Sequence, residues 1–195
     1  MSHWQAIPWI LSAPSGTGKT TVANALLARV PGLTRLITTT TRAPRPGEVD
    51  GVDYHFLSRD AFEQRIAAGG FVEWAQVHGN LYGSQKMHVE QVLNQGLDLL
   101  MVIDVQGAEQ VCAQMAQART IFLLPPSMEE LKARMNGRGD LSDADLILRL
   151  HNAETELAQL PHYDYAVVND DLERCVAAIS GIIQADRHRV VRRRG

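Results

Sequence analysis

The segment LSAPSGTGKTT, residues 11–21, constrains the fold more than any other part of the sequence. An apolar, strand-like run ends there in a turn that contains Gly16 and Gly18, and a helical pattern with Val22 and Leu26 follows. When a strand ends in a glycine-rich turn and the chain restarts as a helix, backbone N–H groups and the helix N-terminus point at one place. The segment therefore predicts a strand, a loop and a helix that together bind phosphate groups.

The loop also matches the pattern G-x-x-x-x-G-K-[ST], except that Ala13 replaces the first glycine. In this pattern the lysine, here Lys19, reaches the β and γ phosphates of a nucleotide, and the hydroxyl of Thr20 binds Mg²⁺. A glycine-rich turn with a chance lysine is the alternative, but strand, loop and helix all occur where the pattern requires them. The sequence thus predicts ATP or GTP binding, with Mg²⁺ as cofactor. The residues predicted to bind the phosphates are Ala13, Pro14, Ser15, Gly16, Thr17, Gly18, Lys19 and Thr20.

Short apolar runs bounded by turn residues recur along the chain and alternate with helical patterns. Runs that are apolar throughout are typical of strands that are buried on both faces of a sheet. We therefore predict an α/β fold in which a mostly parallel sheet lies between two layers of helices. The predicted strands are at residues 9–12, 97–104, 120–126 and 165–169.

Two segments depart from this alternation. Residues 34–84 are rich in β-forming residues, proline and glycine, and we predict that they form an inserted lobe. Residues 134–150 are polar, turn-prone and rich in arginine, which is typical of a mobile lid between two helices. We expect one domain, residues 1–195, whose core comprises about residues 1–33, 85–133 and 151–195.

Composition narrows the class of protein. The 195 residues are 45% hydrophobic with a net charge of −3, which excludes a disordered chain and does not indicate nucleic-acid or membrane binding. Cys112 and Cys175 lie in helical patterns and are expected to be free, buried thiols in a reducing compartment. We see no signal peptide and no membrane-spanning run, so we expect a cytoplasmic protein, monomer or homodimer. The basic C-terminal stretch RHRVVRRRG is expected to be a solvated helix end.

Six ordered blocks of the sequence, between residues 8 and 186, resemble guanylate kinase, a nucleoside monophosphate kinase with a phosphate loop. The resemblance implies phosphoryl transfer from ATP to GMP, and to dGMP, with Mg²⁺. It also implies a three-layer core around a parallel sheet, an inserted GMP-binding lobe of mixed β/α structure and a short lid. Alanine at the first loop position is common in that family. The blocks are SAPSGTGKTT, TTTTRAPRPGEVDGVDYHF, FVEWAQVHGNLYGS, IDVQGAEQV, IFLLPPSMEELKARMNGRG and YDYAVVNDDLE.

Arginines in the segment TRAPRPG are the predicted phosphate-binding groups for the acceptor nucleotide. Prolines restrict the backbone around Arg42 and Arg45, whose planar guanidinium groups can each bind a monophosphate through two hydrogen bonds. The resemblance adds Tyr54 and Tyr82 as phenolic donors to the same phosphate. For two arginines alone a solvated surface loop would be favoured, but beside an intact phosphate loop we favour monophosphate binding.

Guanine presents an O6 acceptor beside N1–H and N2–H donors, so a selective pocket needs both carboxylates and hydroxyls. Glu73 and Asp104 are the candidate carboxylates, although an exposed strand position is the alternative for Glu73. The resemblance assigns the hydroxyls near O6 to Thr38, which stands where serine is more usual, and to Ser84. Adenine would leave these groups unpaired, which can give discrimination of about 10⁴ or more.

One position departs from the family pattern. The family usually carries an acid two residues before Asp104, where this chain has Val102. Mg²⁺ and its waters would then have one carboxylate fewer nearby. We therefore expect metal affinity or turnover to be lower than the resemblance implies.

The predicted lid contributes further arginines. Arg134, Arg138 and Arg149 match arginines that the family closes over the phosphates, although a solvated basic helix end is the alternative. Asn169, at the end of the predicted strand YAVV, is expected near the adenine of ATP, but it could instead cap a helix. The predicted catalytic residues are Lys19, Arg42, Arg138 and Arg149.

Two other classes of protein stay open. The first is a guanylate-kinase-like interaction module that binds peptides and has lost its phosphate loop, and the intact Lys19 and Thr20 argue against it. The second is a kinase for another small phosphorylated substrate. Such a kinase would lack the guanine-binding set of Thr38, Glu73, Ser84 and Asp104.

Overall fold

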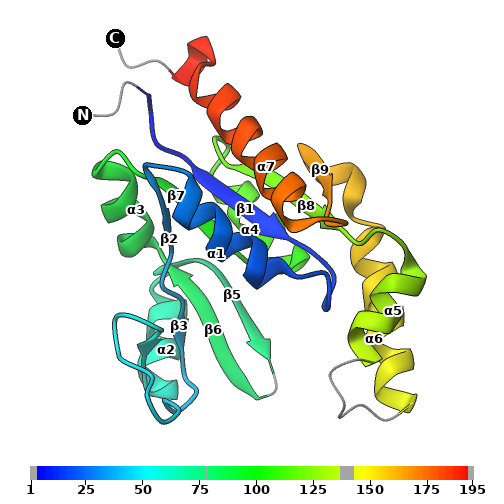
Figure 1. Ribbon diagram of the computed structural model, residues 1–195. Coiled ribbons are helices and arrows are strands. Elements are labelled where there is room, and N and C mark those ends of the chain that lie inside the picture. The colour runs from blue at the N-terminus through cyan, green and yellow to red at the C-terminus, as the bar shows by residue number, and fades with distance from the viewer. Residues whose placement is uncertain (1–3, 78, 137–142, 193–195) are drawn as a thin grey trace.

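The computed structural model describes residues 4–77, 79–136 and 143–192 and contains the predicted parallel sheet (Figure 1). The strand order is β2-β7-β1-β8-β9, every neighbouring pair is parallel, and the strand that leads into the phosphate loop is central. All four predicted strands are present. The strands are β1 (Pro8–Ser12), β2 (Leu33–Arg35), β7 (Asp98–Val102), β8 (Arg119–Leu124) and β9 (Tyr165–Val168).

Successive side chains of the central strand face opposite layers of helices. Trp9 and Leu11 pack in one apolar cluster with buried residues of α1 and α7, whereas Ile10 packs in another with residues of α3 and α4. Figure 1 shows α1 and α7 in front of the sheet and α4 behind it. The predicted three layers are therefore confirmed. The helices are α1 (Lys19–Arg29), α3 (Lys86–Asn94), α4 (Val105–Gln114) and α7 (Leu172–Arg187).

A second, mixed sheet forms the lobe predicted in the middle of the chain. Its order is β4-β3-β6-β5, with β3 parallel to β4 and β6 antiparallel to both its neighbours. Phe62, Phe71 and Leu81 form a separate apolar cluster that holds α2 on this sheet. Residues 34 and 35, which the prediction assigned to the lobe, belong to β2 of the central sheet. The elements are β3 (Thr39–Thr40), β4 (His55–Phe56), α2 (Arg59–Ala67), β5 (Phe71–Val77) and β6 (Asn80–Gln85).

The described part of the predicted lid is helical rather than turn-like. It falls at the end of α5 (Met128–Asn136) and in the first half of α6 (Asp143–Leu157), while residues 137–142 lie outside the described residues. Leu131 of α5 and Leu146 of α6 belong to one buried cluster. Figure 1 shows this helix pair and the lobe on either side of the start of α1.

The structure bears on the predicted burial of the two cysteines and on the search for membrane-spanning helices. Cys112 on α4 is exposed, so its predicted burial is wrong, whereas Cys175 on α7 is buried, and both thiols are free. Across residues 4–77, 79–136 and 143–192, no helix combines the length and the apolar character that crossing a membrane requires.

Within the C-terminal stretch that we predicted to be solvated, residues 188–191 are exposed, but two of the arginines are buried. Arg187 and Arg192 are only 4% and 3% exposed, and they bind the buried carboxylate of Asp98 at 2.9 and 2.6 Å. Arg192 also binds Asp186 at 2.7 Å, and Asp98 accepts a hydrogen bond from the backbone N–H of Ile7. The network therefore joins α7 and η2 (Val190–Arg192) to β7 and to the segment before β1.

We expect Asp98→Asn to lower the free energy of unfolding by about 3–5 kcal/mol, because it deprives Arg187 of its carboxylate and Arg192 of one of two. Equilibrium urea denaturation measures the change. The control Glu173→Gln removes the exposed partner of Arg29 and should cost less than about 1 kcal/mol. A loss for Asp98→Asn no larger than that of the control would contradict a stabilising role for the network.

Candidate active site

The phosphate loop presents its backbone N–H groups without a competing side chain. Gly16 and Gly18 have φ of 87° and 96°, in the left-handed region that glycine adopts without strain. Gly18 is the N-cap residue of α1, and no side chain caps this helix. The first N–H groups of α1 are therefore left for a ligand, which together with the helix dipole makes an anion site.

Lys19, the first residue of α1, projects back over the loop. Its Nζ donates to the carbonyl oxygens of Ala13 at 3.4 Å and Ile103 at 3.5 Å. Burial lowers the pKa of Lys19, and the carboxylates of Glu156 and Asp104 oppose this shift. Because both hydrogen bonds are long, the ammonium group can exchange them for phosphate oxygens at little cost.

A cavity along the loop brings most of the predicted phosphate-binding residues together. It also contains Glu156 of α6, which the sequence analysis did not single out. The predicted residues in its wall are Ala13, Pro14, Ser15, Gly16, Gly18, Lys19 and Thr20. We call this the loop cavity.

A second cavity that borders the loop contains Thr17, Arg134 and Asn169. The side-chain amide of Asn169 donates to the carbonyl of Thr17 at 2.7 Å, and the guanidinium group of Arg134 donates to the carbonyl of Asn169 at 3.2 Å. Asn169 is not a helix cap, because Asp171 caps α7 by accepting from the N–H of Arg174. Asn169 thus fastens β9 to the phosphate loop.

Of the other two predicted lid arginines, the structure describes only Arg149. Arg138 lies outside the described residues. Arg149 is partly exposed on α6 and has no hydrogen bond to another described residue. It precedes Glu156 by two helical turns, so the two side chains share a face of α6, about 10 Å apart along the axis.

The guanine-binding residues predicted from the sequence meet at a cavity between the lobe and the central sheet, which we call the lobe cavity. Arg35 and Val102, at the carboxyl ends of β2 and β7, also line it. The predicted residues in its wall are Thr38, Tyr54, Glu73, Tyr82 and Asp104. Ser84 lies behind them, within hydrogen-bond distance of Glu73.

Glu73 is a buried carboxyl group, 6% exposed, so the alternative of an exposed strand position is wrong. The hydroxyl of Ser84 donates to its Oε1 at 2.5 Å. Burial raises the pKa of Glu73 to about 7, the charge of Asp104 adds to the rise, and the Ser84 hydrogen bonds oppose it. The group is therefore poised to gain or lose a proton near neutral pH.

A carboxylate that the sequence analysis missed holds the predicted phosphate-binding arginines. Both carboxylate oxygens of Glu48 accept from Nη2 of Arg42, at 2.8 and 2.9 Å, and one also accepts from the backbone N–H of Arg45 at 2.7 Å. The guanidinium group of Arg42 lies over the ring of Tyr54, 5.2 Å from its centroid. The side chain of Arg45 is exposed. Arg42 is thus oriented before any ligand arrives.

The loop cavity and the lobe cavity meet at residues 103 and 104. Lys19 lines the first cavity and hydrogen-bonds to the carbonyl of Ile103, which lines the second beside Asp104. Asp104 also caps α4 by accepting from the N–H of Gly107 at 2.8 Å. Two anions bound in the two cavities would therefore be neighbours.

The wall of the loop cavity offers oxygen ligands for Mg²⁺, among them the hydroxyl of Thr20 and the carboxylate of Glu156. No group of three or more His, Cys, Asp or Glu side chains within the described part of the chain could hold a metal ion. Mg²⁺ usually keeps several waters and binds through one or two carboxylates together with substrate phosphates. One hydroxyl and one carboxylate beside a phosphate loop therefore fit a magnesium–nucleotide complex better than a free ion.

Different signals could have identified the two missed acids. Glu48 follows Arg42 by six residues within the same proline-rich loop, so its proximity to the arginines was accessible from the sequence. Glu156 had no such signal, because it follows the phosphate loop by more than a hundred residues. Only the packing of α6 brings it to the loop cavity.

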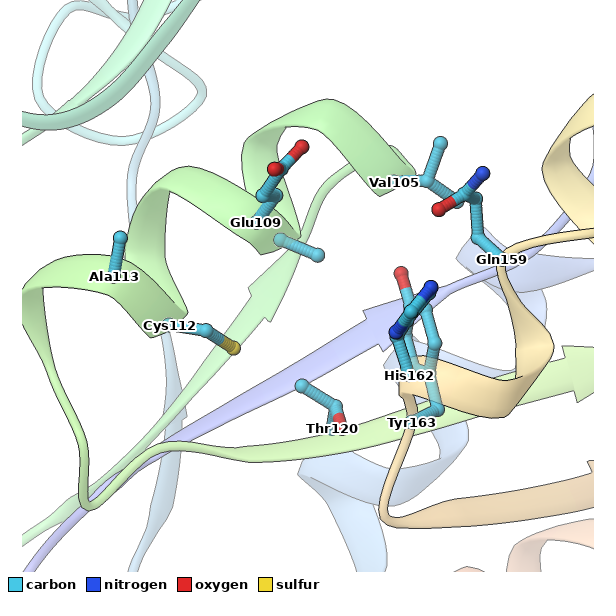
Figure 2. Close-up of a pocket in the computed structure, with 9 residues that line it drawn as sticks. Val105, Glu109, Cys112, Ala113, Thr120, Gln159, His162 and Tyr163 are labelled. Carbon is cyan, nitrogen blue, oxygen red and sulfur yellow. The ribbon is translucent and has the colours of Figure 1, made fainter.

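A further pocket lies between α4 and the short helix η1 (Leu160–His162), and it contains none of the predicted site residues. Figure 2 shows Cys112 and Glu109 on the α4 wall, with Gln159, His162 and Tyr163 on the other wall. Partial desolvation by the pocket wall raises the pKa of the Cys112 thiol, which disfavours the reactive thiolate. This pocket lacks the concentration of phosphate-binding groups that marks the loop cavity.

Comparisons with known proteins agree with this geometry. A family profile described as guanylate kinase matches residues 5–186. Guanylate kinase from Symbiobacterium thermophilum is 46% identical over 94% of this chain and 87% of its own length, and that from Alkalilimnicola ehrlichii is 44% identical over 94% and 91%. The crystal structure of guanylate kinase from Anaplasma phagocytophilum superposes with a TM-score of 0.77 at 35% identity, covering 97% of this chain and 90% of that one. The resemblance drawn from six sequence blocks is thereby confirmed, and the chain belongs to the guanylate kinase family.

Proposed function

We propose that this chain transfers the γ-phosphoryl group of ATP to GMP or dGMP, with ATP in the loop cavity and the acceptor in the lobe cavity. As a guanylate kinase it is a nucleoside monophosphate kinase. The observation that carries the assignment of the two cavities is the hydrogen bond from Lys19 to Ile103, because it joins their walls. Holding donor and acceptor phosphates as neighbours supplies much of the catalysis in phosphoryl transfer.

On the acceptor side, the proposed base-reading groups are two carboxylates and two hydroxyls. Ionised Glu73, with Asp104, would accept hydrogen bonds from N1–H and N2–H of guanine. The hydroxyls of Thr38 and Ser84 would lie near O6. Ser84 already donates to Glu73, which supports its place in this set because the bond favours the ionised carboxylate.

The acceptor phosphate would be bound by the arginines and tyrosines of the lobe. Arg42 and Arg45 would supply guanidinium groups, and Tyr54 and Tyr82 would supply phenolic donors. The orientation of Arg42 by Glu48 and by the Tyr54 ring supports this role, since a preformed donor loses little entropy on binding.

On the donor side, the loop N–H groups and Lys19 would hold the β and γ phosphates, with Arg134 and Asn169 beside them. Mg²⁺ bound with ATP would neutralise charge on these phosphates, and Thr20 would be one of its ligands. Arg138 and Arg149 would approach the transferring group when α5 and α6 close as a lid. No general base is required, because the attacking phosphate oxygen of GMP is already ionised.

The rival functions are less well supported. A peptide-binding module does not require an uncapped helix start with a lysine that hydrogen-bonds back to the loop. A kinase for another phosphorylated metabolite has no use for a buried Glu73–Ser84 pair. We further propose that the protein acts in the cytoplasm on free nucleotides, without nucleic acid or membrane as partner.

Replacement of Lys19 tests the donor side. Lys19→Ala should lower kcat by about 10²-fold or more, because a fixed charge at the transferring group is lost. A coupled assay of ADP release measures this, and circular dichroism should show an unchanged fold. The control Lys86→Ala alters a lysine that lines none of the described cavities and should keep wild-type activity. Retained activity in Lys19→Ala would refute the loop assignment.

Acceptor selectivity tests the lobe cavity. GMP should exceed AMP by about 10⁴ in kcat/KM, since adenine leaves buried carboxylates and hydroxyls unpaired. The same ADP-release assay with GMP, dGMP, AMP, CMP and UMP measures the ratios. Equal turnover of AMP and GMP would contradict the proposed reading of the base.

The pH dependence of GMP binding tests Glu73. Its pKa of about 7 means that the ionised form, which accepts from guanine, is the major form only above that pH. Between pH 8 and pH 6 the GMP affinity of the wild type should fall about tenfold more than that of Glu73→Gln. Calorimetric titration in both proteins measures this, and the variant corrects for titration of the GMP phosphate. Parallel pH profiles would refute the role of Glu73.

A further inference from the structure

Glu156 is a carboxylate in the loop cavity for which the proposed function has no fixed task. It lies on α6, partly buried, in the same cavity wall as Lys19 and Thr20. Its carboxylate forms no hydrogen bond with any described residue. The charged groups that act on it are Lys19 and Asp104, one of each sign.

A carboxylate without a cationic partner repels a bound triphosphate electrostatically. When ATP binds at the loop, its negative charges enter a cavity that already contains Glu156, with Asp104 nearby. Lys19 is the cation in that cavity wall, so it would face two carboxylates and the phosphates together. Such an arrangement is repulsive unless a further cation lies between the acid and the phosphates.

A divalent cation suits this place. Mg²⁺ prefers oxygen ligands and binds to nucleotide sites through one or two carboxylates and the phosphates. Asp104 lines the lobe cavity rather than the loop cavity, and one of its oxygens caps α4. Glu156 is thus the carboxylate in the loop cavity that remains available to the ion.

We propose that Glu156 holds the Mg²⁺ of the bound ATP, directly or through a coordinated water. This inference rests on the proposed function, since it requires ATP and Mg²⁺ at the loop. It also gives α6 a second task. Arg149 shares a face with Glu156, so an ion held by Glu156 would draw the arginine-bearing helix toward the phosphates.

The test measures the magnesium enhancement, which we define as the Kd of a non-hydrolysable ATP analogue in EDTA divided by its Kd in saturating Mg²⁺. In Glu156→Gln the enhancement should fall about tenfold, as is typical when an outer ligand of a metal is removed. The Kd in EDTA should become lower, because one repulsive charge is gone. Calorimetry gives both constants without turnover.

Two simpler roles for Glu156 give different results. If it serves only as the counter-ion of Lys19, the variant binds the analogue more tightly with and without Mg²⁺, and the enhancement is unchanged. If it serves only to pack α6, both affinities fall together and the enhancement is again unchanged. Either result overturns the proposal.

A matched variant completes the experiment. Glu154→Gln removes an exposed carboxylate from the same helix and should leave the enhancement at its wild-type value. Wild-type activity that persists in EDTA would refute the proposed use of Mg²⁺ itself, and this inference with it.

Discussion

The site depends on a helix that begins without a cap. Many helices have a capping side chain that accepts from the first N–H groups. The N-cap residue of α1 is Gly18, which has no side chain, so these N–H groups and the helix dipole are left for an anion. The loop keeps this geometry because Asn169, from the other end of the chain, fastens the carbonyl of Thr17. A side chain at Gly18 would lie 2.8 Å from that same amide. The conformation of the phosphate loop, the start of α1 and the end of β9 therefore all serve to keep these N–H groups free for an anion.

The lobe cavity, where we propose that the acceptor binds, has the opposite arrangement: it contains a carboxyl group whose ionisation is disfavoured by burial. Glu73 is buried with Asp104 nearby, and one hydroxyl at 2.5 Å compensates only part of the cost. The N1–H and N2–H donors of guanine would compensate the remaining desolvation cost of the carboxylate. A site of this kind can therefore reject a base that lacks these two donors. Asp104 links this site to the loop cavity, because its charge acts on Lys19 as well as on Glu73.

The features that were predictable from the sequence are those with local signals. The central sheet was predictable because apolar strand runs and glycine turns are short patterns, and the lobe-cavity residues because they lie in recognisable blocks. Burial was harder to predict. The stretch RHRVVRRRG predicts a solvated end, yet Arg187 and Arg192 are buried, because they bind Asp98, which lies some 90 residues earlier on β7. The helical pattern around Cys112 predicts a buried thiol, yet this thiol is exposed and faces the pocket beside η1. Long-range partners decide such cases, and a local pattern does not contain them.

Glu156 illustrates why a site residue need not lie in a recognisable motif. A metal–phosphate site requires a balance of charge around the phosphates, and a carboxylate can reach the ion from any element that borders the cavity. In this chain the carboxylate is on α6, a helix that also carries Arg149. This helix packs against α5 through Leu131 and Leu146, outside the apolar clusters of the central sheet. An ion held by Glu156 would therefore also hold the helix pair against the phosphate loop.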